Sequence, residues 1–169
     1  ATNPRRMPSW KVLYIQGRYE FKVEQQLARL GIEHYLPKVQ VMRQWSDRMK
    51  KLTVPAFPSY LFVCNEDKDR QAVFQAKGVL HYVRHENQDA IIREEELDLL
   101  RKGGSMIIQN SLQAIRGLKG KQVKIKAGLL AGNTGILVDL IGKKFVQLKL
   151  ENLSMFFLVE IPTDQLQLN

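Results

Sequence analysis

The spacing of hydrophobic residues changes several times along the first half of the chain, and each change predicts a new element. Residues 10–16 alternate with apolar side chains on both faces, which is typical of a central strand. Residues 20–30 have apolar positions at helical spacing, and Gly31 follows where a helix favours a left-handed cap. We therefore predict a strand followed by an amphipathic helix.

The next segments predict a long hairpin and a second central strand. Residues 32–41 are extended in character, and Pro37 favours a strand end or a sheet edge. They lead into a basic stretch at residues 43–51 that resembles a hairpin tip. Residues 55–64 then enter a strand through two prolines, again with apolar side chains on both faces.

A short strand and two short helices complete this half of the chain. A helix is expected from about Asp67 to Gly78, and residues 79–84 return as a strand. A second helix begins near Arg93, where three glutamates at 94–96 suit the positive end of a helix dipole. We interpret these carboxylates as structural and not as catalytic groups.

The chain is predicted to be an α+β protein of two domains. Residues 1–101 form an antiparallel sheet with helices, and the glycine-rich, weakly periodic residues 102–118 form a linker. Residues 119–169 contain short strand-like runs separated by glycines or polar turns, which predict a small all-β barrel.

Composition narrows the class of protein. The chain is 44% hydrophobic, so most of it should fold around a core, and its net charge is +9. A basic surface favours an anionic polymer as partner, although a solvated basic surface without a partner accounts for the same net charge.

The single cysteine, Cys64, excludes an internal disulfide and indicates a reducing compartment. With no apolar signal segment and no run of about 18 apolar residues, we expect a soluble cytoplasmic protein without membrane contact.

Catalytic and metal chemistry find no support in the sequence. His81 and His85 would stand about 13 Å apart along a strand, too far to share an ion. No hydrolase motif occurs, and Gly128, Gly132 and Gly135 lack the Gly-Lys-Ser/Thr of a phosphate loop, so they are predicted to form tight turns. We expect a protein that is not an enzyme and needs no cofactor or metal.

Three aromatic residues on the predicted strands indicate a binding surface. Tyr14, Tyr60 and Phe62 fall on strand faces opposite to those expected to pack on the helix of residues 20–30. If helices cover only one side of the sheet, these rings form an exposed docking patch. The alternative is a second layer of core.

These segments together resemble the NusG family, including its specialised paralogue RfaH. The similarity covers nearly the whole chain from Trp10, and its second half looks like a KOW motif. The matching residues are Trp10 to Tyr14, Glu20, Gly31-Ile32, Leu36-Pro37, Phe57 to Val63, Gly78-Val79, Tyr82 to Arg84, and Gly120 to Val123 with Gly128, Gly132 and Gly135.

The resemblance implies a transcription elongation factor. Its amino-terminal domain would bind the clamp helices of the RNA polymerase β′ subunit and suppress pausing or termination on selected operons. Carried over by position, the polymerase-binding residues would be Tyr14, Tyr60, Phe62, Tyr82 and His85. Non-template or upstream DNA would be contacted by Arg18, Lys22 and Lys77, although solvated charge on a helix face explains Arg18 and Lys22 equally well.

The second domain would be an SH3-like KOW barrel that recruits other machinery, such as the termination factor Rho or a small-subunit ribosomal protein. Its predicted loops carry apolar residues that form either a partner surface or lids over the barrel: Leu129, Leu130, Leu153 and Met155.

Two departures from the family favour a specialised, RfaH-like antiterminator. General members usually have glycine where this chain has Ser59. In addition, Asp69, Arg70 and Gln71 stand where RfaH has the His-Thr-Thr triplet that touches the polymerase gate loop, so the resemblance does not imply that contact here. RfaH also refolds its second domain, but the β-branched and aromatic runs at 145–150 and 155–161 give no reason to expect that here. The competing hypothesis is a KOW-containing nucleic-acid module that acts on RNA or the ribosome without polymerase.

Overall fold

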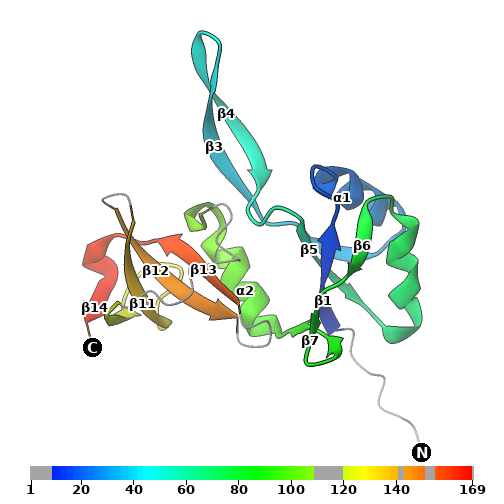
Figure 1. Cartoon of the computed structure of the whole chain (residues 1–169). Helices are drawn as coiled ribbons and strands as arrows, with labels where there is room; N and C mark the ends of the chain where they lie inside the picture. Colours follow the sequence, from blue (N-terminus) through cyan, green and yellow to red (C-terminus); the bar gives the residue numbers. More distant parts are fainter. Residues whose placement is uncertain (1–8, 109–119, 141–142, 151–154, 169) are drawn as a thin grey trace, which may run out of the picture. The chain divides into compact units, whose positions relative to one another are not determined.

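The computed structural model describes residues 9–108, 120–140, 143–150 and 155–168 (Figure 1). Contacts group the chain into two compact units. Unit 1 comprises residues 1–36 and 58–94, and unit 2 comprises residues 37–57 and 95–169. We describe each unit by itself.

Unit 1 is built on a five-stranded antiparallel sheet with the predicted strand at its centre. β1 (Ser9–Ile15) pairs with β5 (Tyr60–Asn65) on one side and with β6 (Val79–Tyr82) and β9 (Ile91–Ile92) on the other. β2 (Glu33–Tyr35) extends the sheet beyond β5. Both predicted central strands are confirmed, since β1 and β5 are buried along most of their length.

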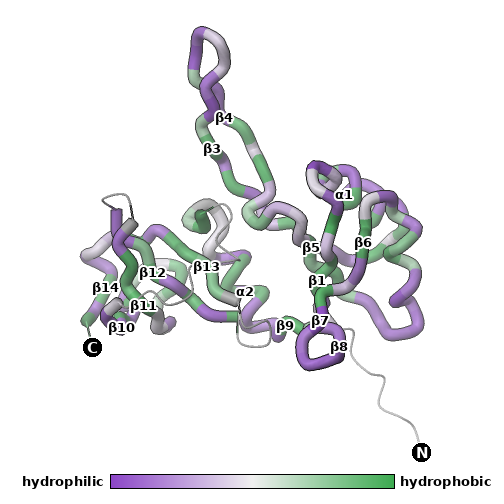
Figure 2. Tube along the Cα trace, in the orientation of Figure 1, coloured by the Kyte–Doolittle hydropathy of each residue, from purple (hydrophilic) through white to green (hydrophobic). Residues whose placement is uncertain are grey.

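The core of unit 1 lies between this sheet and helix α1 (Glu20–Arg29). Val23 and Leu27 of α1 pack against Leu13 and Leu61, and all four side chains are fully buried. Burial of each such side chain contributes roughly 1.5–3 kcal/mol. The 3-10 segment η1 (Asp67–Gln75) adds to the same core, and Figure 2 shows the hydrophobic colour along β1 and β5.

Helix α1 ends where its sequence predicts. Gly31 adopts φ +73°, the left-handed conformation that only glycine adopts without steric cost. The backbone N–H of Gly31 donates to Ala28 O, and that of Ile32 donates to Leu27 O, so the last carbonyls of the helix are satisfied.

Unit 2 contains the hairpin and a second antiparallel sheet. The hairpin is β3 (Lys38–Trp45) and β4 (Arg48–Pro55), and its basic tip is where the sequence predicts it. Helix α2 (Glu94–Gly103) opens on the predicted glutamates, and η2 (Gly104–Met106) follows it. The second sheet has the order β13 (Met155–Glu160), β12 (Lys143–Leu150), β11 (Thr134–Leu140), β10 (Gln122–Ile125), β14 (Leu166–Leu168).

One expectation for this part of the chain is not shown by the structure, and another needs correction. The second sheet runs from β13 to β14, and among the described residues no strand pairing closes it into the expected barrel. Residues 102–108, expected in a linker, are ordered by contacts: Lys102 and Gly103 belong to α2, and Ile107 bridges to Val159 of β13. The rest of the expected linker, residues 109–118, lies outside the described residues.

Candidate functional site

Pairing across the sheet of unit 1 brings aromatic side chains together on one face. Tyr14 stands opposite Tyr60 on β5 and opposite His81 on β6. Phe62 stands opposite Tyr35 on β2. Because directly paired residues point to the same side of a sheet, these rings share the face turned away from Leu13 and the α1 core. We call them the aromatic face: Tyr14, Tyr35, Tyr60, Phe62 and His81.

The rings of the aromatic face are in direct contact. Tyr14 packs edge-on against Tyr60 with ring centroids 5.6 Å apart, and stacks on His81 at 5.1 Å. Tyr35 stacks on Phe62 at 6.3 Å. His81 is exposed, Tyr14 and Tyr35 are partly exposed, and Tyr60 and Phe62 are buried. The accessible part of the face therefore comprises Tyr14, Tyr35 and His81, and Tyr14 and His81 stack directly on each other.

Tyr82 does not belong to this face, which corrects its assignment as a docking residue. It stands opposite Leu13, so its ring enters the core and is only 2% exposed. Its hydroxyl donates to Arg70 O at 2.8 Å and accepts from Asn65 Nδ2 at 3.1 Å. Burial raises the pKa of the Tyr82 hydroxyl. His81 takes the position on the aromatic face that the sequence interpretation gave to Tyr82.

His85 lies in the two-stranded ribbon of β7 (Arg84–His85) and β8 (Gln88–Asp89), outside the five-stranded sheet. Its Nε2 is 3.7 Å from the Glu86 carboxylate. None of the described ring contacts joins it to the aromatic face.

A partly buried charge network lies on the core side of the same sheet. Lys11 Nζ is 3.2 Å from Asp67 and 3.5 Å from Asp89, and Arg70 binds the Asp89 carboxylate through two contacts of 2.8 and 3.0 Å. The hydrogen bond from Arg70 holds the pKa of Asp89 below its usual value. The guanidinium also lies 4.5 Å from the centre of the Tyr82 ring.

This network includes one of the residues 69–71, which align with the gate-loop triplet of RfaH but differ from it. The middle one, Arg70, is held by Asp89 and is only partly exposed. That side chain serves the fold, while Asp69 and Gln71 remain exposed.

The three residues expected to contact DNA lie on one edge of unit 1. Arg18, Lys22 and Lys77 are all exposed. Gln26 of α1 links two of their segments, because its side-chain amide donates to Lys22 O and Lys77 O, and its oxygen accepts the Lys77 N–H at 2.9 Å. Their proximity makes this edge a basic cluster suited to phosphate groups.

The loop residues of unit 2 that were predicted to bind a partner differ in exposure. Leu129 is 71% exposed, whereas Leu130 is 2% exposed, so Leu130 is a buried packing residue and not a surface contact. Leu153 lies outside the described residues, and the described part of Met155 is limited to its backbone in β13.

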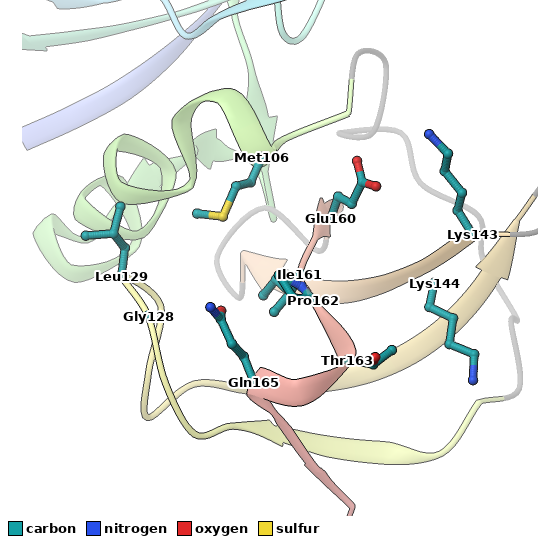
Figure 3. Close-up of a pocket in the computed structure, with 10 residues that line it drawn as sticks. All are labelled: Met106, Gly128, Leu129, Lys143, Lys144, Glu160, Ile161, Pro162, Thr163 and Gln165. Carbon is teal, nitrogen blue, oxygen red and sulfur yellow. The ribbon is translucent and has the colours of Figure 1, made fainter.

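Leu129 borders an open groove of about 740 Å³ within unit 2 (Figure 3). Leu129 and Met106 line one end of it, and Lys143 and Lys144 line the other. Glu160 lines the groove as well, so its charged lining has two cations and one carboxylate. An apolar end beside this mainly cationic lining suits a protein partner with apolar and acidic side chains.

The glycines near this groove have two different roles. Gly128 and Gly132 adopt φ of +88° and +94°, which confirms the predicted tight turns. Gly135 lies in β11 instead, where a Cβ would stand 2.5 Å from the backbone oxygen of Gln147. It is required for close strand packing, not for a turn.

No group of three or more His, Cys, Asp or Glu side chains that could hold a metal occurs among the described residues. Within the same residues, no helix has the length and hydrophobicity needed to cross a membrane.

Comparison with known proteins identifies the family. A family model described as "Transcription termination factor nusG" matches residues 8–101. The fold is similar to that in "Domain interaction in Thermotoga maritima NusG", with 18% identity, a TM-score of 0.58, and coverage of 95% of this chain and 96% of that chain. Conformation A of the "MjSpt4:Spt5 complex" matches at 15% identity with a TM-score of 0.31, covering 95% of this chain and 97% of that one, and carries no argument. No curated protein matches. Because the family model covers more than half of the sequence, the chain belongs to the NusG family of transcription factors.

Proposed function

We propose that this protein is a transcription elongation factor whose aromatic face docks on the clamp helices of the RNA polymerase β′ subunit. The observation that carries the proposal is the contact of Tyr14 with Tyr60 and His81 on the sheet face opposite the α1 core. Family membership supports the transcription role. Tyrosine is enriched at the energetic centres of protein interfaces, where a helix pair would cover these rings.

The mechanism requires binding energy alone. A factor that binds polymerase in its elongating state more tightly than in a paused state shifts the enzyme toward elongation by that difference in affinity. The protein therefore needs no catalytic residue, and we propose that it is not an enzyme. As a specialised, RfaH-like family member it would suppress pausing or termination on selected operons.

The basic cluster of Arg18, Lys22 and Lys77 would hold upstream or non-template DNA once the aromatic face has docked. Each lysine or arginine that neutralises a phosphate releases a counterion, so its contribution is greatest at low salt. Unit 2, in this proposal an SH3-like KOW domain, would recruit Rho or a small-subunit ribosomal protein through the groove beside Leu129.

The docking claim is tested by replacing Tyr14 and His81 together with alanine and measuring polymerase binding by surface plasmon resonance. Because the two side chains are accessible, the circular dichroism should stay that of the folded protein. Each side chain should contribute roughly 1 kcal/mol or more to binding, so the affinity for polymerase should fall at least about 30-fold. Leu80→Ala is the matched control, because Leu80 lies beside His81 on β6 and is 49% exposed. Equal binding by the double variant and the control would sink the docking claim.

A nucleic-acid module acting without polymerase is the second candidate, and the net charge of +9 together with the basic cluster favours it. Polymerase binding separates the two functions. A module of this kind would not bind purified polymerase, and its function would be carried by free RNA or DNA, with affinity falling steeply as salt increases.

A further inference from the structure

The hairpin of unit 2 has a basic tip that the proposed docking does not use. Every residue from Met42 to Lys51 is exposed, and Asp47 is the single carboxylate between residues 38 and 57. Figure 2 shows the polar colour gathered toward the tip. The base is anchored, since Val39 and Phe57 are buried and Phe57 packs edge-on against Phe157 at 6.5 Å.

The strand register separates the two faces of this ribbon. Arg43 pairs with Lys50, and Trp45 pairs with Arg48, so these four side chains share one face. We call it the tryptophan face. The opposite face carries Met42 paired with Lys51, and Gln44 paired with Met49.

The tryptophan face is unfavourable for folding. Two cations directly opposite each other, such as Arg43 and Lys50, destabilise a strand pair. Neither forms an ion pair with a carboxylate in the described part of the chain, and Trp45 remains 52% exposed although the Lys50 ammonium lies 4.9 Å from its ring centre. A polyanion with flat apolar groups would offset both costs at once.

From this geometry we infer that the tryptophan face is a second binding site, for single-stranded nucleic acid. Trp45 stacks on an unpaired base, and Arg43, Arg48 and Lys50 contact the flanking phosphates. Successive cross-strand pairs on one face repeat at roughly 7 Å along the ribbon, so the cations flank the ring on a scale of one or two nucleotides. A base paired within a duplex would not present its face to Trp45, which favours a single strand over a duplex.

The test uses the full chain and a fluorescein-labelled RNA of about 12 nucleotides without secondary structure, followed by fluorescence anisotropy at low salt. A DNA strand of the same sequence and the corresponding duplex form the other arms. Trp45→Ala should weaken binding to the single strand by about 5- to 150-fold, the range for loss of one stacked base. Trp45→Phe keeps an aromatic face and should recover most of the affinity.

Two neighbouring lysines provide a charge-matched comparison. Lys50→Ser removes a cation from the tryptophan face, whereas Lys51→Ser removes the same charge from the opposite face. Lys50→Ser should reduce the slope of log affinity against log salt by about 0.7, the value for one phosphate contact on a single strand, and Lys51→Ser should leave the slope unchanged. Circular dichroism checks that each variant is folded.

Three results would overturn the inference: no effect of Trp45→Ala, identical salt slopes for the two lysine variants, or preference for the duplex over the single strand. Because polymerase is absent from the assay, none of these results bears on the docking of the aromatic face.

Discussion

Replacing Asp89 with asparagine should destabilise unit 1 near neutral pH and much less in acid. Asp89 receives two hydrogen bonds from Arg70 at 2.8 and 3.0 Å and lies 3.5 Å from Lys11 Nζ, whose side chain is 6% exposed. Removing one partner from a fully buried ion pair costs roughly 3–5 kcal/mol. Arg70 is 32% exposed, and Lys11 retains Asp67, so we expect a loss of about 2–3 kcal/mol from this partly solvated network.

The pH dependence follows from the lowered pKa of Asp89. Since its pKa is lower in the folded than in the unfolded state, the carboxylate contributes its full stabilisation above the unfolded value of about 3.9. That contribution is lost as pH falls through the folded-state pKa. The stability difference between the wild type and Asp89→Asn should therefore be largest near neutral pH and shrink as the pH falls from the unfolded value of about 3.9 through the lowered folded-state pKa.

Urea unfolding followed by tryptophan fluorescence measures this difference in unit 1 alone if Trp45 is first changed to Phe. The remaining tryptophan, Trp10, lies buried in β1. Lys68→Ser is a suitable control because Lys68 is near the network in sequence but, in the part of the chain that the structure describes, pairs with the exposed Glu66 and not with the network. A loss in Asp89→Asn that is the same at neutral and acid pH would refute the assignment of the stabilisation to this charge network.

Three further predictions concern single positions. Ser59→Gly should stabilise unit 1 by about 0.5–1 kcal/mol in the same unfolding assay, because Ser59 holds φ +74° and glycine adopts that conformation without steric cost; an unchanged midpoint would contradict this. Gly135→Ala should destabilise unit 2 by roughly 1–3 kcal/mol, because the added methyl would meet Gln147 O, and thermal unfolding by circular dichroism checks it. Leu129→Ser should abolish binding of the partner to the groove, measured by isothermal titration with Rho or the ribosomal protein. Because Leu129 is exposed, the thermal midpoint of unit 2 should stay within about 2 °C of the wild type. Unaltered affinity would exclude the groove as the binding site.

The parts of the fold that the sequence predicts correctly are those determined by local signals. In β1, apolar residues alternate on both faces, which indicates a central strand whatever its neighbours are. In α1, the helical spacing is followed by Gly31, whose positive φ ends the helix. Both signals lie within a few residues of the element that they specify.

Strand register could not be predicted in the same way. A shift of one residue exchanges the two faces of a strand, and β6 is too short for its own pattern to decide which residue faces the core. The decision comes from distant contacts, namely the hydrogen bonds of the Tyr82 hydroxyl to Asn65 and Arg70. The sequence interpretation assigned Tyr82 to the docking surface by its position in the family pattern, which does not determine strand register, and it did not include His81.

Contacts between distant segments also explain why the linker was misplaced. Glycines at 103 and 104 suggest a break, yet a Cβ at Gly103 would lie 3.1 Å from the Ile107 side chain, so this glycine permits tight packing within unit 2. A glycine that serves close approach and one that serves flexibility have the same appearance in a sequence.

The two departures from the family pattern that favoured a specialised role both have structural explanations. Ser59 occupies a left-handed backbone position in which its N–H donates to the buried Glu20 carboxylate at 3.0 Å, so the choice between glycine and serine there changes backbone strain and leaves this hydrogen bond in place. Arg70, which stands in place of the middle residue of the RfaH triplet, binds Asp89 within the protein. The Arg70 side chain is therefore held within unit 1, and at Ser59 it is the backbone that is constrained. The specialised role that we propose is therefore tested on the accessible surfaces: variants of the aromatic face, the basic cluster and the tryptophan face should each be compared for termination readthrough on different operons.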